Sequence, residues 1–467
     1  MRKIYWYITA YIKKHGLTFF ISVFFAIAFF SVFIPILAKK ITIKKKRYIG
    51  VVGEYNLKNL PTEVKNSLSV GLTKVNPEDK NVKPLLAERW ITEDSGKTYR
   101  FIIKKDVFWT DGKELVTDDV NYNFKDVETI TTPNDVIFKL PDKFAPFPQI
   151  VSEPLLRYES EAHLFFFKRP TVVGIGPYRL TSYQNQSGRL KQVVLDGPKQ
   201  RLVYRFYLTE QNALMAFKKG EVDLLKNITN PQNLINWKEI NIKKSINFDQ
   251  YLAVFFNNQD PLLKKNIRQA LNYSVKKEAG TARALGPINP NSWAYLEGGK
   301  DYNKDMDRAV ERLLEGLPPE PLKLTLTTTS LFTNEAERIK AEWEQLGQAA
   351  YTACQKDGDV ENKGLCNNAQ ITIDVKISNF PDTNNFQLLL IGQQIPDDPD
   401  QYFMWHSDQA TNFTNYKNTR IDSLLEKGRQ TLEQQERKAA YQEFQQFLLE
   451  DPPAIFLTYL LSYTISR

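Results

Sequence analysis

The chain has 467 residues, of which 42% are hydrophobic and 25% are charged, and its formal net charge is +8. This length exceeds the usual size of one hydrophobic core, so it predicts two or three globular domains and excludes a mainly disordered protein. Residues 1–47 contain ten of the 62 Lys and Arg residues and no acidic residue, so the other 52 basic residues face 54 acidic ones. Because the rest of the chain has no excess of basic residues to bind phosphates, we expect no nucleic-acid partner.

Residues 17–38, LTFFISVFFAIAFFSVFIPILA, are uncharged and would cross about 30 Å of hydrocarbon as a helix. Aromatic residues suited to a membrane interface precede this stretch: Tyr5, Trp6, Tyr7 and Tyr11. The stretch is longer than the apolar core of a signal peptide, and the bulky Ile36 occupies the −3 position relative to cleavage after Ala38. We therefore expect an uncleaved membrane anchor, with a cleaved signal peptide as the alternative. No cysteine stands directly after the stretch, so we expect no attachment as a lipoprotein.

Two features bear on the side of the membrane that the body occupies. Four Lys or Arg residues precede the apolar stretch and six follow it, which favours a cytoplasmic C-terminus, but long domains often translocate regardless of flanking charge. Cys354 and Cys366 flank a polar segment, and a disulfide between them would suit an oxidising compartment. The alternative is that the two cysteines are unrelated reduced thiols, since the sequence does not show whether their Cα atoms lie close enough for a disulfide.

The body is expected to mix helices and strands, and the first pattern after the basic segment is a β-hairpin. Residues 90–109 contain a turn at Ser95-Gly96, followed by an alternating strand with Tyr99, Phe101 and Ile103. Asp111-Gly112 predicts a second turn, after which Thr117 is expected to cap the start of a helix.

Later elements follow the same alternation of helix and strand. Asn334 and Glu337 predict the start of a helix that runs to about Ala350, and ITIDVKI at 371–377 predicts a strand. Two helices with apolar faces are expected near the C-terminus, the second ended by Asp451-Pro452-Pro453; their apolar residues are Ile421, Leu424 and Leu425, then Tyr441, Phe444, Phe447 and Leu448.

Five stretches, taken in order, resemble the family 5 extracellular solute-binding proteins, which include oligopeptide-, dipeptide- and nickel-binding proteins. The most specific is residues 71–124, with its LAERW turn, GKTYRF strand and WTDG turn. The others are GIGPYRLTSY at 174–183 and residues 205–225, 251–278 and 397–429. The resemblance as a whole covers nearly all of residues 50–467.

The resemblance implies an α/β fold: two periplasmic-binding-protein-like lobes of type II with an extra inserted domain, preceded by one transmembrane helix. The expected parts are the anchor and its basic flanks at 1–47, lobe one at 48–68, 174–250 and 455–467, the inserted domain at 69–173, and lobe two at 251–454. Chain crossings near residues 250 and 454 would form the hinge. A ligand enclosed between lobes is removed from water on all sides, which permits strong hydrogen bonding.

The implied function is the substrate-binding component of an ABC importer, which captures an oligopeptide-like solute and passes it to a membrane permease driven by an ATPase. We expect a monomer without cofactor or enzymatic activity. Gly174-Ile175-Gly176 lacks the third glycine of a dinucleotide motif and is read as a turn where the chain crosses between domains. The alternatives are a membrane-anchored ligand sensor with the same fold, an oligosaccharide ligand in place of a peptide, and a membrane-anchored hydrolase.

Peptide-binding members of the family carry a Trp and an Asp shortly before an acid-Pro turn, and that Asp pairs with the ammonium of the peptide. Here Gln393-Gln394-Ile395-Pro396 stands at that place, before Asp397. A buried ammonium without a carboxylate would cost several kcal/mol, so either Asp397 takes this role or the ligand has no free amino terminus there.

The expected ligand-binding residues combine side chains that form hydrogen bonds with flat aromatic rings. They are Tyr55, Gln393, Gln394, Ile395, Asp397, Asp398 and Trp405. Asp398 is also typical of a helix start, and core packing is the competing interpretation for both aromatic residues. We expect no metal site, because His15, His163 and His406 lie far apart without the spacing of metal ligands.

Overall fold

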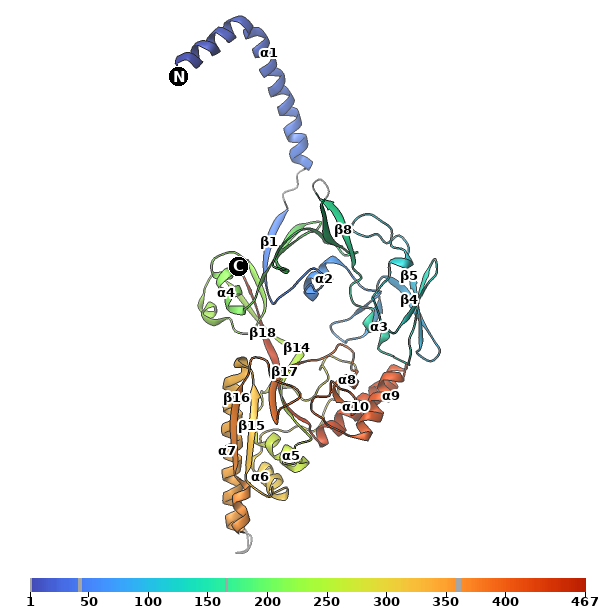
Figure 1. Ribbon diagram of the computed structural model, residues 1–467, viewed down its shortest axis with the longest axis vertical. Helices are drawn as coiled ribbons and strands as arrows, with labels where there is room; N and C mark the ends of the chain where they lie inside the picture. Colours follow the sequence, from blue (N-terminus) through green and yellow to red (C-terminus); the bar gives the residue numbers. More distant parts are fainter. Residues whose placement is uncertain (1, 41–43, 164–166, 358–362) are drawn as a thin grey trace.

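The computed structural model describes residues 2–40, 44–163, 167–357 and 363–467 (Figure 1). The N-terminal apolar stretch forms helix α1 (Arg2–Lys40), which departs from helical geometry at His15 and extends away from the body. Lys13–Ser31 is the one segment of the described chain that is long and apolar enough to cross a membrane. Its large apolar side chains are exposed, for example Leu17 and Phe24, and no other part of the molecule covers them.

Lobe one is built on parallel and antiparallel strands whose buried side chains form two adjoining hydrophobic clusters. Its strands are β1 (Lys45–Val52), β10 (Arg179–Gln186), β11 (Arg189–Asp196), β12 (Gln200–Tyr207) and β13 (Leu224–Ile228). Its helices are α2 (Thr62–Leu68), α4 (Glu210–Lys218) and the 3-10 turn Gln232–Asn236. The antiparallel hairpin of β8 (Arg157–His163) and β9 (Phe167–Val173) lies beside this lobe.

The inserted domain has its own aromatic-rich core around a four-stranded antiparallel sheet. Its elements are β2 (Thr73–Val75), β3 (Val82–Pro84), β4 (Ala87–Glu93), β5 (Thr98–Ile103), β6 (Glu128–Thr131), β7 (Asp135–Lys139) and α3 (Phe147–Ile150). The hairpin predicted within residues 90–109 is confirmed as β4 and β5, and its Tyr99, Phe101 and Ile103 are buried as expected.

The prediction of a helix that starts at Thr117 is wrong. Residues Thr117–Asp119 form a single 3-10 turn. The carboxylate of Asp119 accepts hydrogen bonds from the Val116 backbone and from the indole of the buried Trp109, at 3.2 and 2.9 Å. The bond to Val116 is the capping contact of a helix start, but the backbone becomes extended at Val120, so the turn does not continue as a helix.

Lobe two contains strands β15 (Leu322–Thr328), β16 (Ile371–Ile377) and β17 (Leu388–Gln394). Its helices are α5 (Lys265–Ser274), α6 (Met306–Glu315), α7 (Thr333–Asp357), α8 (Tyr402–Trp405), α9 (Thr419–Gln430) and α10 (Gln434–Glu450), with 3-10 turns at Gly280–Ala282, Ser330–Phe332 and Lys363–Ala369. Strand β16 has the predicted bounds, and α10 ends just before Asp451. Helix α7 starts as predicted and continues past Ala350.

Two long strands, β14 (Asn241–Phe256) and β18 (Ala454–Ser466), join the lobes into one sheet of ten strands. The sheet order is β10-β11-β12-β1-β13-β18-β14-β17-β15-β16, so β13 of lobe one meets β18 and β17 of lobe two meets β14. The pairing of β14 with β18 shifts register between Asn247 and Tyr251. On β18, the residues paired on either side of this shift are Leu460 and Tyr459, and the hinge positions near residues 250 and 454 stay predictions. Unpaired residues at such an irregularity let two halves of a sheet rotate.

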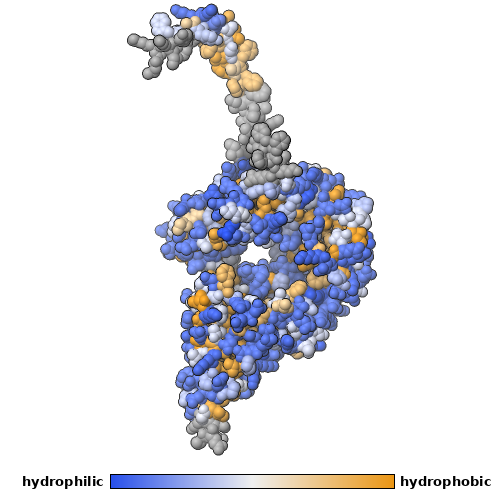
Figure 2. All heavy atoms as spheres, in the orientation of Figure 1, coloured by the Kyte–Doolittle hydropathy of each residue, from blue (hydrophilic) through white to orange (hydrophobic). Residues whose placement is uncertain are grey.

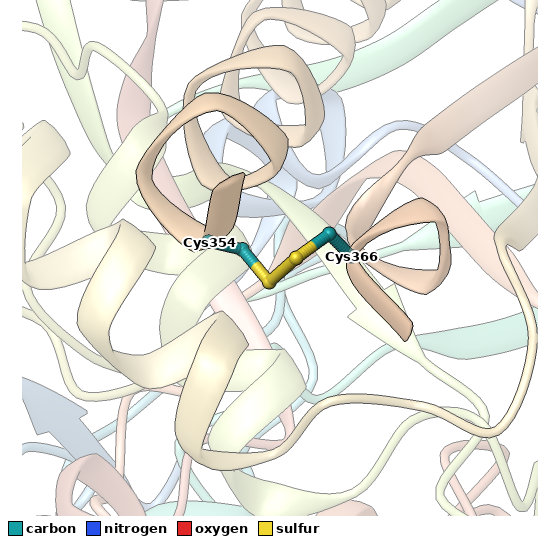
Figure 3. Close-up of a disulfide and its surroundings, with 2 residues drawn as sticks. All are labelled: Cys354 and Cys366. Carbon is teal, nitrogen blue, oxygen red and sulfur yellow. A yellow bond between two sulfur atoms is a disulfide. The ribbon is translucent and has the colours of Figure 1, made fainter. Parts of the chain in front are cut away.

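Cys354 and Cys366 are joined by a disulfide that connects the end of α7 to the following 3-10 turn (Figure 3). Their Cα atoms lie 5.6 Å apart, within the usual range for a disulfide. The bridge closes a loop between two residues that are 12 positions apart in the sequence. Of the two interpretations left open by the sequence, the structure has the bonded one.

Replacing both cysteines with serine should destabilise the protein by about 3 kcal/mol, because the open loop gains conformational freedom in the unfolded chain. Urea unfolding of the full chain in non-ionic detergent measures this as a lower midpoint. The unmodified chain treated with a reducing agent should show the same loss, and the reducing agent should leave the serine variant unchanged. Equal midpoints for all samples would contradict the prediction.

Candidate functional site

An opening lies between the two lobes beside the hinge strands, as Figure 2 shows, in the region where Figure 1 places α2, α3 and β18. The inserted domain reaches across to lobe two on the side away from the hinge. There the backbone N–H of Ala145 donates to the carbonyl of Arg429 at 2.8 Å, and the Gln434 amide donates to Asn81 at 2.6 Å. The opening is thus bordered by all three parts of the body.

A cavity of about 310 Å³ is lined by residues of all three parts. Asp397 contributes from lobe two, Thr62 and Asn66 from α2, and Lys74 and Glu153 from the inserted domain. The Asp397 side chain is 45% exposed. Asp397, a predicted ligand residue, therefore lies where the two lobes and the inserted domain meet, and part of its side chain is accessible to solvent.

Gln393 and Gln394 end strand β17 beside the hinge. They pair with Tyr251 and Gln250 of β14, and the amide of Gln250 donates to Gln394 Oε1 at 2.9 Å. Gln394 is exposed and Gln393 is half-buried, so amide donors and acceptors are presented where the two lobes meet. As neighbours on one strand, the two side chains point to opposite faces of the sheet, and a ligand-binding role for either residue stays a prediction.

Tyr55 lies on lobe one, where its ring packs against Phe206 with centroids 5.4 Å apart and its hydroxyl donates to the Val52 carbonyl at 3.2 Å. The ring is half-buried and forms part of the lobe-one surface. The structure does not bring Tyr55 into contact with the glutamines or with Asp397.

Three predicted ligand residues have buried side chains. Trp405 is completely buried in the core of lobe two, and Ile395 is 3% exposed. Asp398 is buried and paired with Arg437, with Nη2 and Oδ1 2.7 Å apart. Burial raises the pKa of Asp398, and the charge of Arg437 opposes this rise. Trp405 and Ile395 support the core of lobe two, whereas Asp398 also lines a cavity between lobe two and the inserted domain.

Lys80 and Asp249 are site residues that the sequence interpretation missed. The Lys80 ammonium lies 2.8 Å from Asp249 Oδ1 and 2.7 Å from Asp397 Oδ1. Burial lowers the pKa of Lys80, but hydrogen bonds and attraction from the two carboxylates outweigh burial and raise it above its ordinary value. Lys80 belongs to the inserted domain, Asp249 to the hinge part of β14 and Asp397 to lobe two, so no local sequence pattern could have linked them.

A second cavity, of about 460 Å³, lies between the inserted domain and lobe two. Lys80, Trp90 and Gln149 line it from the inserted domain, and Trp293 and Arg437 from lobe two. Lys80 borders this cavity while its partner Asp397 borders the smaller one, so their ion pair stands between the two spaces.

Within the described residues, no group of three or more His, Cys, Asp or Glu side chains is close enough to hold a metal ion. The site instead consists of amides, carboxylates and one ammonium around an opening between hinged lobes. This arrangement suits the binding of a polar organic solute.

Two α/β lobes joined by two strands, with an inserted domain and a polar opening between them, define a solute-binding protein of the periplasmic-binding-protein fold. The model of the bacterial extracellular solute-binding proteins, family 5, matches residues 81–415, and the chain belongs to this family. Family 5 proteins are non-enzymatic, extracytoplasmic solute-binding components of ABC transporters.

The chain is 24% identical to the oligopeptide-binding protein AppA of Bacillus subtilis over 480 aligned positions, covering 88% of this chain and 85% of AppA. The structure of AppA with a nonapeptide has a TM-score of 0.62 at 19% identity, covering 91% of this chain and 95% of that one. NikZ of Campylobacter jejuni, solved with Ni(L-His), has a TM-score of 0.68 at 23% identity and covers 91% and 94%. The solutes of these similar proteins therefore range from peptides to a nickel complex.

Proposed function

We propose that this protein captures a peptide-like solute between its two lobes and delivers it to a membrane permease that is driven by an ATPase. The observation that supports capture by closure is the hinge. Strands β14 and β18 run through both lobes, and their pairing is irregular at the opening, between Asn247 and Tyr251. Two rigid lobes joined at such a break can close around a ligand without unfolding either core.

The polar groups at the opening favour a peptide-like solute over an apolar one. Gln393 and Gln394 present amide groups that match the donors and acceptors of a peptide backbone. Asp397 adds a partly exposed carboxylate on the same side of the hinge. Similarity to an oligopeptide-binding protein over most of the chain supports the same solute class.

We also propose that α1 remains attached and anchors the body outside the cytoplasm. The apolar segment Lys13–Ser31 has no side chain buried in the body, so lipid is the environment that would cover it. The disulfide between Cys354 and Cys366 supports an oxidising compartment for the body. The N-terminal sequence of the protein isolated from membranes tests retention of α1, since a chain that begins after residue 38 would show cleavage.

Binding is tested by the thermal stability of the full chain in detergent with four ligand panels: mixed pentapeptides, glutathione, oligosaccharides and a nickel–histidine complex. A ligand at 100 times its Kd should stabilise the protein by about 2.7 kcal/mol, and we expect this from the pentapeptides. Stabilisation by oligosaccharides or nickel–histidine alone would overturn the peptide-like solute.

A matched pair of variants ties the binding to the opening. Gln393→Ala should weaken peptide binding about five- to tenfold, because one side-chain hydrogen bond is lost. Gln348→Ala, on the exposed face of α7, should leave the affinity unchanged. Equal affinities in the two variants would remove Gln393 from the proposed contacts.

A further inference from the structure

Lys80 occupies the position in which a cationic group of a ligand would otherwise contact Asp249 and Asp397 at the opening. Its ammonium contacts one oxygen of Asp249 and one of Asp397, at 2.8 and 2.7 Å, and its side chain is only 7% exposed. The two acids are 44% and 45% exposed, so they face the open space while Lys80 is enclosed. A pair of carboxylates this close together is a natural binding position for an ammonium, and here the protein supplies that ammonium itself.

The local backbone holds Lys80 in this position. It is at the tip of the β2–β3 hairpin with φ of 56°, a left-handed conformation that is unusual for a lysine. Hydrogen bonds between the backbones of Asn76 and Lys80 and of Asn76 and Asn81, both 2.8 Å, close the turn. An uncommon backbone conformation that is held by hydrogen bonds on both sides indicates that the protein fixes the position of the Lys80 side chain.

The acids are also held in place. Asp249 Oδ1 accepts a second hydrogen bond from the Asn289 amide at 2.8 Å, and its backbone carbonyl accepts from Ile395 N–H at 2.8 Å. Asp249 therefore cannot turn away to offer a ligand the same oxygen. A ligand ammonium at this point would have to share the acids with Lys80 and would be repelled by it.

We propose that Lys80 determines ligand specificity by filling the ammonium position of the opening, so that the preferred solute is a peptide-like molecule without a free amino terminus there. This inference rests on the proposed function, since it names the chemical class of the captured solute. N-acylated peptides and peptides with a blocked or modified end belong to this class. The amide groups of such ligands do not compete with Lys80 for the acids.

The test compares one pentapeptide mixture in its free and N-acetylated forms, bound to the full chain in detergent and followed by calorimetry. The unmodified protein should bind the acetylated form at least as tightly as the free form. Lys80→Met leaves two carboxylates without their cation and should shift the preference toward the free form by about tenfold or more. Lys80→Arg keeps the positive charge and should retain the preference for acetylated peptides.

Lys105→Met is the matched control, because Lys105 is an exposed lysine of the same inserted domain. It should bind both peptide forms as the unmodified protein does. Tighter binding of free than of acetylated peptides by the unmodified protein would overturn the role of Lys80 and leave the proposed function standing. This result does not depend on the folding of any variant. Binding of neither form to the unmodified protein or to Lys80→Met would overturn the proposed function and the inference with it.

Discussion

Arg437→Met is expected to destabilise lobe two by about 3–5 kcal/mol, because it leaves the carboxylate of Asp398 buried without a partner. The side chains of Arg437 and Asp398 are 9% and 12% exposed, and their charged atoms are 2.7 Å apart. Arg437 Nε also donates to the Gly428 carbonyl at 2.8 Å, and the guanidinium lies over the rings of Trp293 and Tyr441. Urea unfolding of the full chain in detergent, followed by tryptophan fluorescence, measures the loss.

Helices α9 and α10 also provide an exposed ion pair as a control. Arg420 and Glu443 pair on the surface, with side chains 55% and 37% exposed. Arg420→Met should cost about 1 kcal/mol or less, since water solvates the remaining acid. Combining Arg437→Met with Asp398→Asn should recover part of the loss, because the uncompensated charge is removed. Similar midpoints for Arg437→Met and Arg420→Met would contradict the assigned importance of the buried pair.

Gly174→Ala is expected to destabilise the protein at the base of the inserted domain. The expected loss of unfolding free energy is near the upper end of a range of about 1–3 kcal/mol. A Cβ atom at residue 174 would lie 2.0 Å from the backbone oxygen of Leu68, and backbone cannot move aside as a flexible side chain can. The same carbonyl accepts the N–H of Gly176 at 2.7 Å, so displacing it also strains this hydrogen bond. Urea unfolding should show the loss, and hydrogen exchange should increase at residues 68–71 and 174–176.

Gly364→Ala provides the control, since a Cβ atom there would meet no other atom within 4 Å. It should leave the stability unchanged or raise it by about 0.4–1 kcal/mol through a less flexible unfolded chain. If Gly174→Ala behaved like Gly364→Ala, the close approach of the two segments at the base of the inserted domain would be refuted.

Local patterns determined many elements of this fold. Alternating apolar residues predicted strand β16 with its observed bounds, and the Ser95-Gly96 turn predicted the hairpin of β4 and β5. Asp451-Pro452-Pro453 marked the end of α10. These predictions succeeded because periodicity and turn residues act over a few neighbouring positions. The helix expected at Thr117 ends after one turn, where Asp119 also accepts a hydrogen bond from Trp109, a contact that the local pattern does not contain.

The candidate site depended much more on the tertiary structure. The sequence predicted Gln393, Gln394 and Asp397 as ligand residues, because the resemblance to a family places them near the position where peptide-binding members carry a Trp and an Asp. It could not show that Trp405 and Ile395 lie in the core, since aromatic and aliphatic side chains occur both in the walls of ligand sites and in cores.

By itself, the sequence determined the family, the apolar N-terminal helix, the mixed α/β character and the segment that carries the acid. Only the tertiary structure decided that the acid, Asp397, pairs with Lys80. Lys80 is separated from Asp249 by 169 positions and from Asp397 by 317, and the three side chains meet because the inserted domain folds back onto the hinge side of lobe two. An ion pair depends on distance in space, and no pattern of neighbouring residues encodes a contact between such distant parts of the chain.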